Sequence, residues 1–207
     1  MLTLTYALVA LSVEQRKVKG RVLELQQEIE LERKQRLLSN QAHVEFLVAQ
    51  FIKLDEACRM RNIELYVLPA IRSATSEADS LLADIDALTL MGRITLKTVH
   101  ARLRQATARG SFELDFLCDS LQQYCEDMLK RLALEETQVL PLAQRVISSD
   151  EWFDIAARFI SSDLSRQDTH DHDTHDHDAL DAEEGQVSRA STMRAANEPA
   201  ARRHALN

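Results

Sequence analysis

The stretch KRLALEETQVLPLAQRVISSDEW, residues 130–152, places a carboxylate on an apolar helix face. Leu132 and Val139 lie seven residues apart, and Glu135 falls between them on the same face, one turn after Arg131. A carboxylate is rarely buried without a partner, because an unpaired charge loses its hydration and gains nothing in return. We therefore expect Glu135 to belong to a metal site, to the remains of one, or to a salt bridge at the edge of a core.

Three other apolar faces also carry one polar residue each. Gln15 interrupts the first predicted helix, Glu64 the second and Thr89 the third, in phase with the apolar residues around them. Buried polar groups must meet partners, so four breaks in matching phase predict one shared polar layer. The alternative is that each break is a separate residue, satisfied locally or partly exposed.

The elements that position these residues are predicted to be long helices. The chain has 207 residues, 45% of them hydrophobic, with only 4 Gly and 3 Pro, which favours long helices around one substantial core. Apolar residues alternate at spacings of three and four, and short connections of roughly 4 to 8 residues make neighbouring helices antiparallel. The sequence therefore predicts an all-α, up-down-up-down four-helix bundle. The predicted inward faces are Leu8, Leu11, Val18, Val22, Leu25 and Ile29; Val44, Leu47, Phe51, Leu54, Ala57, Met60, Val67 and Ile71; Ala78, Leu82, Ile85, Gly92, Leu96, Val99 and Leu103; and Leu114, Cys118, Leu121, Cys125, Met128, Leu132 and Val139.

Capping residues indicate where these helices begin. The pair Ser39-Asn40 precedes the second helix, and Thr75-Ser76 precedes the third, with Asp79 completing a capping box with Ser76. Gly110 closes the last connection and Ser111 caps the fourth helix.

After the fourth helix, Pro141 should end or kink the element. The run SSDEWFDIAARF then predicts a short fifth helix, with Ser148 and Glu151 as its capping box. Its apolar residues Trp152, Ile155 and Phe159 are expected to lie against the bundle.

The chain divides into a bundle domain, 1–164, and a tail, 165–207, that we expect to be disordered because it has no apolar periodicity. The tail repeats DTHDH in tandem, so its histidines alternate with aspartates. Such a tract can bind divalent transition metals weakly, although we favour a solvated low-complexity segment. The tail histidines concerned are His170, His172, His175 and His177.

Two segments of the chain echo each other and carry a family resemblance. IELYVLPAI, 63–71, and EETQVLPLA, 135–143, both place an acidic residue shortly before Val-Leu-Pro. The second segment resembles the HHE-type, hemerythrin-like proteins, whose last helix typically carries His-x-x-x-Glu-Glu leading into Leu-Phe-Pro-Leu-Ala. The run SSDEWFDIAARF looks like the closing helix of that family, and LQQYC (121–125) falls where it often has Leu-x-x-Tyr. The resemblance covers about residues 8–164.

The resemblance implies a pair of iron ions held by histidines and carboxylates inside the bundle. The carboxylate ligands of the family match Glu64 and Glu135, whereas its histidines match Gln15, Met60, Thr89 and Arg131. Both carboxylates therefore remain and every assignable histidine is replaced. The remaining bundle histidines, His43 and His100, do not fall on ligand positions.

Arg131 is the least suitable of these replacements, because its permanent positive charge would repel a metal ion. It would instead supply positive charge beside Glu135, four residues away. The alternative is an arginine that reaches solvent and bridges Glu135 or Asp127 at the surface.

Two function classes follow. In the first, the chain is a non-enzymatic regulatory or interaction module without a cofactor, acting on a protein partner that the sequence does not identify. In the second, it binds non-haem diiron and acts in oxygen, nitric oxide or iron handling. We see no nucleophile–base pair, phosphate loop or nucleotide motif, which favours a protein that is not an enzyme.

The net charge, the hydropathy and the cysteines indicate which partners and which cellular compartment to expect. The net charge of -8 gives no basic footprint for nucleic acid or for an anionic membrane, and no apolar run approaches the ~20 residues that span a bilayer. The apolar opening MLTLTYALVAL lacks a basic region and a cleavage site. Three cysteines without a CxxC motif, Cys58, Cys118 and Cys125, indicate reduced thiols, so we expect a cytoplasmic protein.

Overall fold

The computed structural model describes residues 2–35, 41–109 and 114–162, and every regular element in those ranges is helical. This confirms the predicted all-α class. The long helices are α1 (Leu2–Gln35), α2 (Gln41–Arg59), α4 (Asp79–Arg109) and α5 (Leu114–Leu134). The short elements are the π-helix η1 (Ile63–Val67), α3 (Leu68–Ala74), the π-helix η2 (Glu135–Val139), α6 (Leu140–Val146) and a last helix over 149–162.

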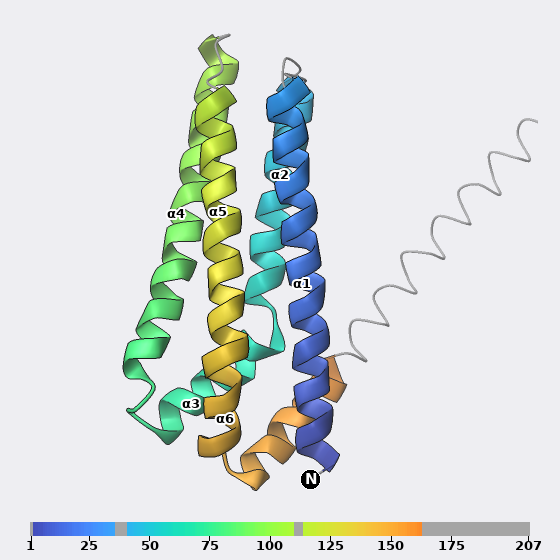
Figure 1. The fold of residues 1–207 in the computed structure, drawn as a ribbon, viewed down its shortest axis with the longest axis vertical. Helices are drawn as coiled ribbons and strands as arrows, with labels where there is room; N and C mark the ends of the chain where they lie inside the picture. Colours follow the sequence, from blue (N-terminus) through green and yellow to red (C-terminus); the bar gives the residue numbers. More distant parts are fainter. Residues whose placement is uncertain (1, 36–40, 110–113, 163–207) are drawn as a thin grey trace, which may run out of the picture. The chain divides into compact units, whose positions relative to one another are not determined.

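The four long helices contact one another in a closed order within one compact unit, Met1–Phe159. Helix α1 packs against α2 and α5, and α4 packs against the same two neighbours (Figure 1). The short helices α3 and α6, which follow the two π-helices, also contact each other. Along the chain, each π-helix is therefore placed between a long helix and a short one.

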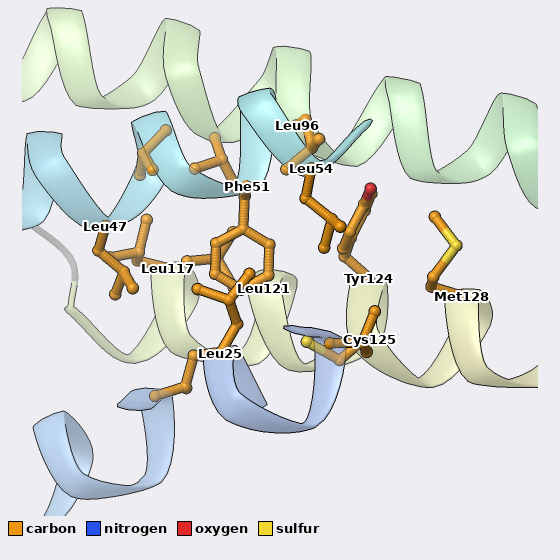
Figure 2. Close-up of a cluster of buried hydrophobic side chains, with 14 of the residues drawn as sticks. Leu25, Leu47, Phe51, Leu54, Leu96, Leu117, Leu121, Tyr124, Cys125 and Met128 are labelled. Carbon is orange, nitrogen blue, oxygen red and sulfur yellow. The ribbon is translucent and has the colours of Figure 1, made fainter. Parts of the chain in front are cut away.

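The apolar core has two parts, which we name after their central phenylalanines. The Phe51 cluster, part of which is drawn in Figure 2, comprises Val18, Val22, Leu25, Ile29, Val44, Leu47, Val48, Phe51, Leu54, Cys58, Leu96, Val99, Leu103, Leu117, Cys118, Leu121, Tyr124, Cys125, Met128 and Leu132. The Phe159 cluster comprises Ala7, Leu11, Ile63, Val67, Leu68, Ile71, Ala78, Leu82, Ile85, Val139, Leu140, Ala143, Ile147, Trp152, Ile155, Ala156 and Phe159. Most of the predicted inward residues belong to one of these two clusters.

The end of α2 departs from the predicted register. Ala57 and Met60 were expected to face inward, but both are exposed, Met60 at 57%. Cys58 and Arg61 are buried in their place. The spacing of three and four that begins at Val44 continues to Cys58 and Arg61, so the prediction was wrong by one residue at this point.

The two prolines of the repeated Val-Leu-Pro motif follow π-helical turns. A proline has no backbone N–H, and its ring clashes with the carbonyl four residues earlier, so an α-helical pattern cannot continue through it. The wider turns of η1 and η2 replace the α-helical pattern just before Pro69 and Pro141, and helix then continues to Ala74 and Val146. Pro141 therefore interrupts the α-helical pattern without ending the helical path.

The predicted start of the last helix is confirmed. The Ser148 hydroxyl and backbone N–H both donate to the Glu151 carboxylate, at 2.9 and 3.0 Å, and the Glu151 N–H donates to the Ser148 hydroxyl at 3.3 Å. Trp152, Ile155 and Phe159 are buried as expected.

The start of α4 differs from the predicted capping box. The Thr75 hydroxyl accepts a hydrogen bond from the Glu77 N–H at 3.1 Å, and Ser76 contributes its carbonyl to the Asp79 N–H at 3.2 Å. The predicted caps at Ser39-Asn40, Gly110 and Ser111, and the predicted tail, 165–207, lie outside the described residues.

The apolar opening of the chain forms part of the core. Ala7 and Leu11 belong to the Phe159 cluster, with Leu4, Leu8 and Ala10 partly buried against it. Within the described ranges, no helix is long and apolar enough to cross a membrane.

Candidate functional site

The polar residues of the predicted layer lie where the two apolar clusters meet. Along α1, Gln15 falls between Leu11 of the Phe159 cluster and Val18 of the Phe51 cluster. Along α5 and η2, Glu135 falls between Leu132 and Val139 in the same way. The core is therefore divided by a layer of buried polar and charged groups.

The centre of this layer is a bidentate ion pair between Arg61 and Glu135. Arg61 Nη1 donates to Glu135 Oε2 at 2.8 Å, and Arg61 Nη2 donates to Oε1 at 2.7 Å. Arg61 is 4% exposed and Glu135 is fully buried. Two parallel charge-assisted bonds of this kind fix both distance and orientation, so they are among the stronger polar contacts in proteins.

Arg131 and Glu64 complete the cluster. Arg131 Nε donates to Glu135 Oε1 at 3.0 Å, while Arg131 Nη2 forms an ion pair with Glu64 Oε1. Arg61 Nη2 also reaches Glu64 Oε1, at 3.2 Å. Each guanidinium therefore contacts both carboxylates, and the arrangement, which we call the Arg–Glu cluster, has no net charge.

The two arginines have different electrostatic surroundings. Burial acts to lower the pKa of Arg61, but the hydrogen bonds and charge of Glu135 outweigh it and the pKa is raised. Burial also lowers the pKa of Arg131; Glu135 opposes this effect and the neighbouring positive charge of Arg61 adds to it, so the pKa falls. Arg61 is consequently the better neutralised of the two cations.

Hydrogen bonds to neighbouring helices hold the cluster in place. Gln15 Nε2 on α1 donates to the Leu132 carbonyl on α5 at 2.8 Å, and Arg61 Nε donates to the Cys58 carbonyl at 3.2 Å. Next to Arg61, the Asn62 N–H and side-chain amide both donate to the Glu14 carboxylate, at 3.0 and 2.9 Å. The bonds of Gln15 and Glu14 tie α1 to both halves of the cluster.

The predicted site residues are thus only partly brought together. Glu64, Glu135 and Arg131 meet directly, and Gln15 bonds the backbone beside them. Thr89 donates to the Ile85 carbonyl of its own helix at 2.8 Å and lines a cavity of about 10 Å³ that Arg131 also lines. Met60, matched to a family histidine position, points to solvent instead.

Arg131 is 2% exposed, so the alternative in which it bridges carboxylates at the surface is wrong. Arg61 is the site residue that the sequence analysis missed. Its signal was the unbroken three–four spacing through Val44, Leu47, Phe51, Leu54, Cys58 and Arg61.

The histidines that lie in described parts of the chain are placed at the surface. His43 Nε2 lies 2.6 Å from Glu32 Oε1, and His100 is exposed on the wall of a groove of about 240 Å³ between α2 and α4. Among the residues that the structure describes, no three His, Cys, Asp or Glu side chains gather as a group that could hold a metal ion. The tail histidines His170, His172, His175 and His177 lie outside those residues.

The three cysteines are unpaired and buried. Burial raises the pKa of Cys125 from 9.0 to about 12 and also raises that of Cys58 and Cys118. Because the thiolate is the reactive form, all three are expected to behave as inert core thiols.

Comparisons of this chain with protein-family models, with curated proteins and with solved structures find no match. The hemerythrin-like resemblance remains an interpretation of the sequence pattern.

Proposed function

We propose that this protein is a non-enzymatic regulatory or interaction module on a hemerythrin-like scaffold, in which the Arg–Glu cluster occupies the place of an iron pair. The single observation that carries the proposal is the burial of Glu135 together with its hydrogen bonds to two arginines. This carboxylate is fully buried, and both of its oxygens accept hydrogen bonds from arginine guanidiniums. Arg61 and Arg131 supply the positive charge that a metal ion would otherwise supply.

The residues at the matched positions do not fit a pair of iron ions. Iron in such sites is bound by neutral imidazole nitrogen and by carboxylate oxygen. Here the carboxylate oxygens of Glu64 and Glu135 are turned toward two permanent cations, and the Met60 thioether faces solvent. A metal ion placed between the carboxylates would have to displace both guanidiniums from a buried position, which is costly.

We propose that the scaffold is an up-down-up-down four-helix bundle. Two features support this fold. The four long helices contact one another in a closed order, with α1 and α4 each between α2 and α5. In addition, Glu64 and Glu135 both belong to π-helices that precede Leu-Pro. π-helical turns occur frequently at functional sites, which fits a scaffold descended from a metal-binding one.

The pairing within the cluster supports a non-enzymatic role. General acid–base catalysis requires a group that can accept or donate a proton at a substrate. The carboxylate of Glu135 has no access to solvent, and Glu64, 19% exposed, is bound by both arginines. The cluster therefore acts on the stability and shape of the module. The unpaired, buried thiols support a cytoplasmic location.

The test is iron loading of the full chain under anaerobic conditions, followed by metal analysis and an absorption spectrum. Replacing His170, His172, His175 and His177 by alanine removes binding by the tail from the measurement. We expect this variant to bind no stoichiometric iron. Adding Arg131→His should not change this result, because Arg61 still forms its ion pair with the Glu135 carboxylate. Two irons per chain with an oxo-bridge absorption band would overturn the proposal and favour oxygen, nitric oxide or iron handling.

A further inference from the structure

The outer face of α4 carries an uncharged stripe with exposed large apolar side chains. Leu90, Met91 and Ile94 are all about half exposed in the middle of the helix. The same face continues in both directions through Ala83, Ala87, Thr98 and Ala101, which are also exposed. From residue 80 to residue 101 the stripe is roughly 32 Å long at 1.5 Å per residue. Contiguous exposed apolar surface of this kind often marks an interface.

The charges of α4 are divided between its two halves. Its acidic residues are Asp79, Asp84 and Asp86, all before Leu90, and its basic residues are Arg93, Lys97, Arg102, Arg104 and Arg109, all after Met91. Attraction to the helix dipole acts only within the first and last turns. It therefore does not account for Asp86 or Arg93, which lie well inside the helix.

Five of these charges border the stripe on one side. Asp79, Asp86, Arg93, Lys97 and Arg104 follow one another at spacings of seven, seven, four and seven residues, which keeps them on the same flank, and all five are exposed. Two copies of α4 in parallel would set acid against acid and base against base. In antiparallel order, the acidic half of each flank meets the basic half of the other.

We propose that the outer face of α4 binds the same face of a second copy of this chain, antiparallel, with the two-fold axis close to Leu90 and Met91. In this arrangement Ala87 of each copy lies opposite Ile94 of the other. Lys97 then lies near Asp86 of the other copy, whose carboxylate also binds Arg72 at 2.7 Å on its own chain. Such a contact is self-complementary, as two-fold symmetry requires. It does not depend on the proposed role of the Arg–Glu cluster.

The first test is the mass of the full chain in solution, measured by sedimentation equilibrium over a range of concentrations. We expect a monomer–dimer equilibrium that Met91→Glu abolishes, because the two introduced carboxylates would face each other near the axis. The control is Val9→Glu, which adds the same charge at an exposed apolar position on α1. A monomer at every concentration up to ~100 μM, or a dimer unaffected by Met91→Glu, would overturn the proposal.

The second test fixes the orientation. Ala87→Cys and Ile94→Cys chains are mixed, oxidised mildly and compared with each variant alone and with the unmodified chain, whose thiols are buried. Antiparallel pairing predicts disulfide-linked dimers that contain one chain of each variant. Linked dimers that form instead between two chains of the same variant would indicate parallel pairing and contradict the proposal. Lys97→Glu should raise the dimer dissociation constant by roughly 2- to 30-fold, because two symmetry-related pairs are lost.

Discussion

Arg61 and Glu135 lie 74 residues apart in the chain and meet through two parallel hydrogen bonds between the two apolar clusters. This pair joins the segment that ends α2 to the segment that ends α5, and each segment carries one arginine and one glutamate of the cluster. Because each arginine contacts both glutamates, the cluster fixes the register of the two halves relative to each other.

Removing Arg61 should be strongly destabilising. Arg61→Met leaves the fully buried Glu135 with only Arg131 as a cationic partner, and breaking a buried pair in this way typically costs about 3–5 kcal/mol. The matched control is Arg145→Met, which removes an exposed pair with Glu77 worth about 0–1 kcal/mol. Denaturant unfolding of both variants at neutral pH measures the difference. Equal losses in the two variants would show that the Arg61 pair contributes no more than a surface contact.

Arg131→Ala should also be destabilising by a few kcal/mol at neutral pH, because Glu64 and Glu135 lose one of the two cations that bridge them. The measurement is again the free energy of unfolding in denaturant. A loss below about 1 kcal/mol would mean that Arg131 contributes no more than an exposed ion pair does.

Removing both members of the central pair should be less harmful than removing one. In Arg61→Met combined with Glu135→Leu, no uncompensated charge is buried, and Arg131 still pairs with Glu64. Apolar replacement of a complete buried pair is often neutral or stabilising. We expect the double variant to be more stable than Arg61→Met alone by at least about 1–2 kcal/mol. A double variant whose loss equals the sum of the two single losses would contradict a coupled pair.

Two glycines inside long helices should respond oppositely to alanine. A Cβ on Gly92 would lie 3.1 Å from Tyr124 Cε2, and Tyr124 is held by its edge-on contact with Phe51, with ring centres 5.6 Å apart. Figure 2 shows these two rings side by side within the Phe51 cluster. A Cβ on Gly20 meets nothing within 4 Å.

Gly20→Ala should therefore gain about 0.5–1 kcal/mol from helix propensity. Gly92→Ala gains the same propensity but loses about 1–3 kcal/mol to overpacking. Thermal or denaturant unfolding of the two variants in parallel gives the difference directly. If Gly92→Ala were as stable as Gly20→Ala, Tyr124 would be free to move aside.

Stability should fall at alkaline pH because of the buried thiols. The folded state raises the pKa of Cys125 from 9.0 to about 12, so above pH 9 the unfolded chain has lost a proton that the folded chain keeps. The contribution of the protonated Cys125 thiol to the free energy of unfolding is complete below pH 9. It is lost as the pH rises towards 12, at about 1.4 kcal/mol per pH unit for one thiol. Unfolding free energies at about pH 8, 9 and 10.5 test this. Cys125→Ala should have a shallower slope, and an unchanged slope would contradict the assignment.

The sequence predicted the fold class and about half of the site, for identifiable reasons. Leu121, Cys125, Met128 and Leu132 are spaced regularly enough to fix the phase of α5, and so to place Glu135 inward. The same rule, applied strictly to α2, places Arg61 inward. The general preference for an apolar residue over a cation at a core position favours Met60 instead, and here that preference is misleading.

The remainder of the site depends on partners that a single helix does not reveal. Arg61 is stable in the core only because Glu135, on another helix, lies within bonding distance. The π-helical turns are also hard to predict, because Pro69 and Pro141 indicate only that the α-helical pattern breaks. How the backbone accommodates each proline depends on the neighbouring elements, such as the contact between α3 and α6.

The composition of the Phe159 cluster has a consequence for the order in which the chain folds during synthesis. The cluster contains Ala7 and Leu11 from the start of α1, together with Trp152, Ile155 and Phe159 from the last helix. At about 5–20 residues per second, roughly 8–30 s separate the synthesis of Ala7 from that of Phe159. The Phe51 cluster, whose last member is Leu132, can close earlier. During that interval the apolar side of the first turns of α1 has no complete core to enter, which makes the nascent chain a candidate for chaperone binding.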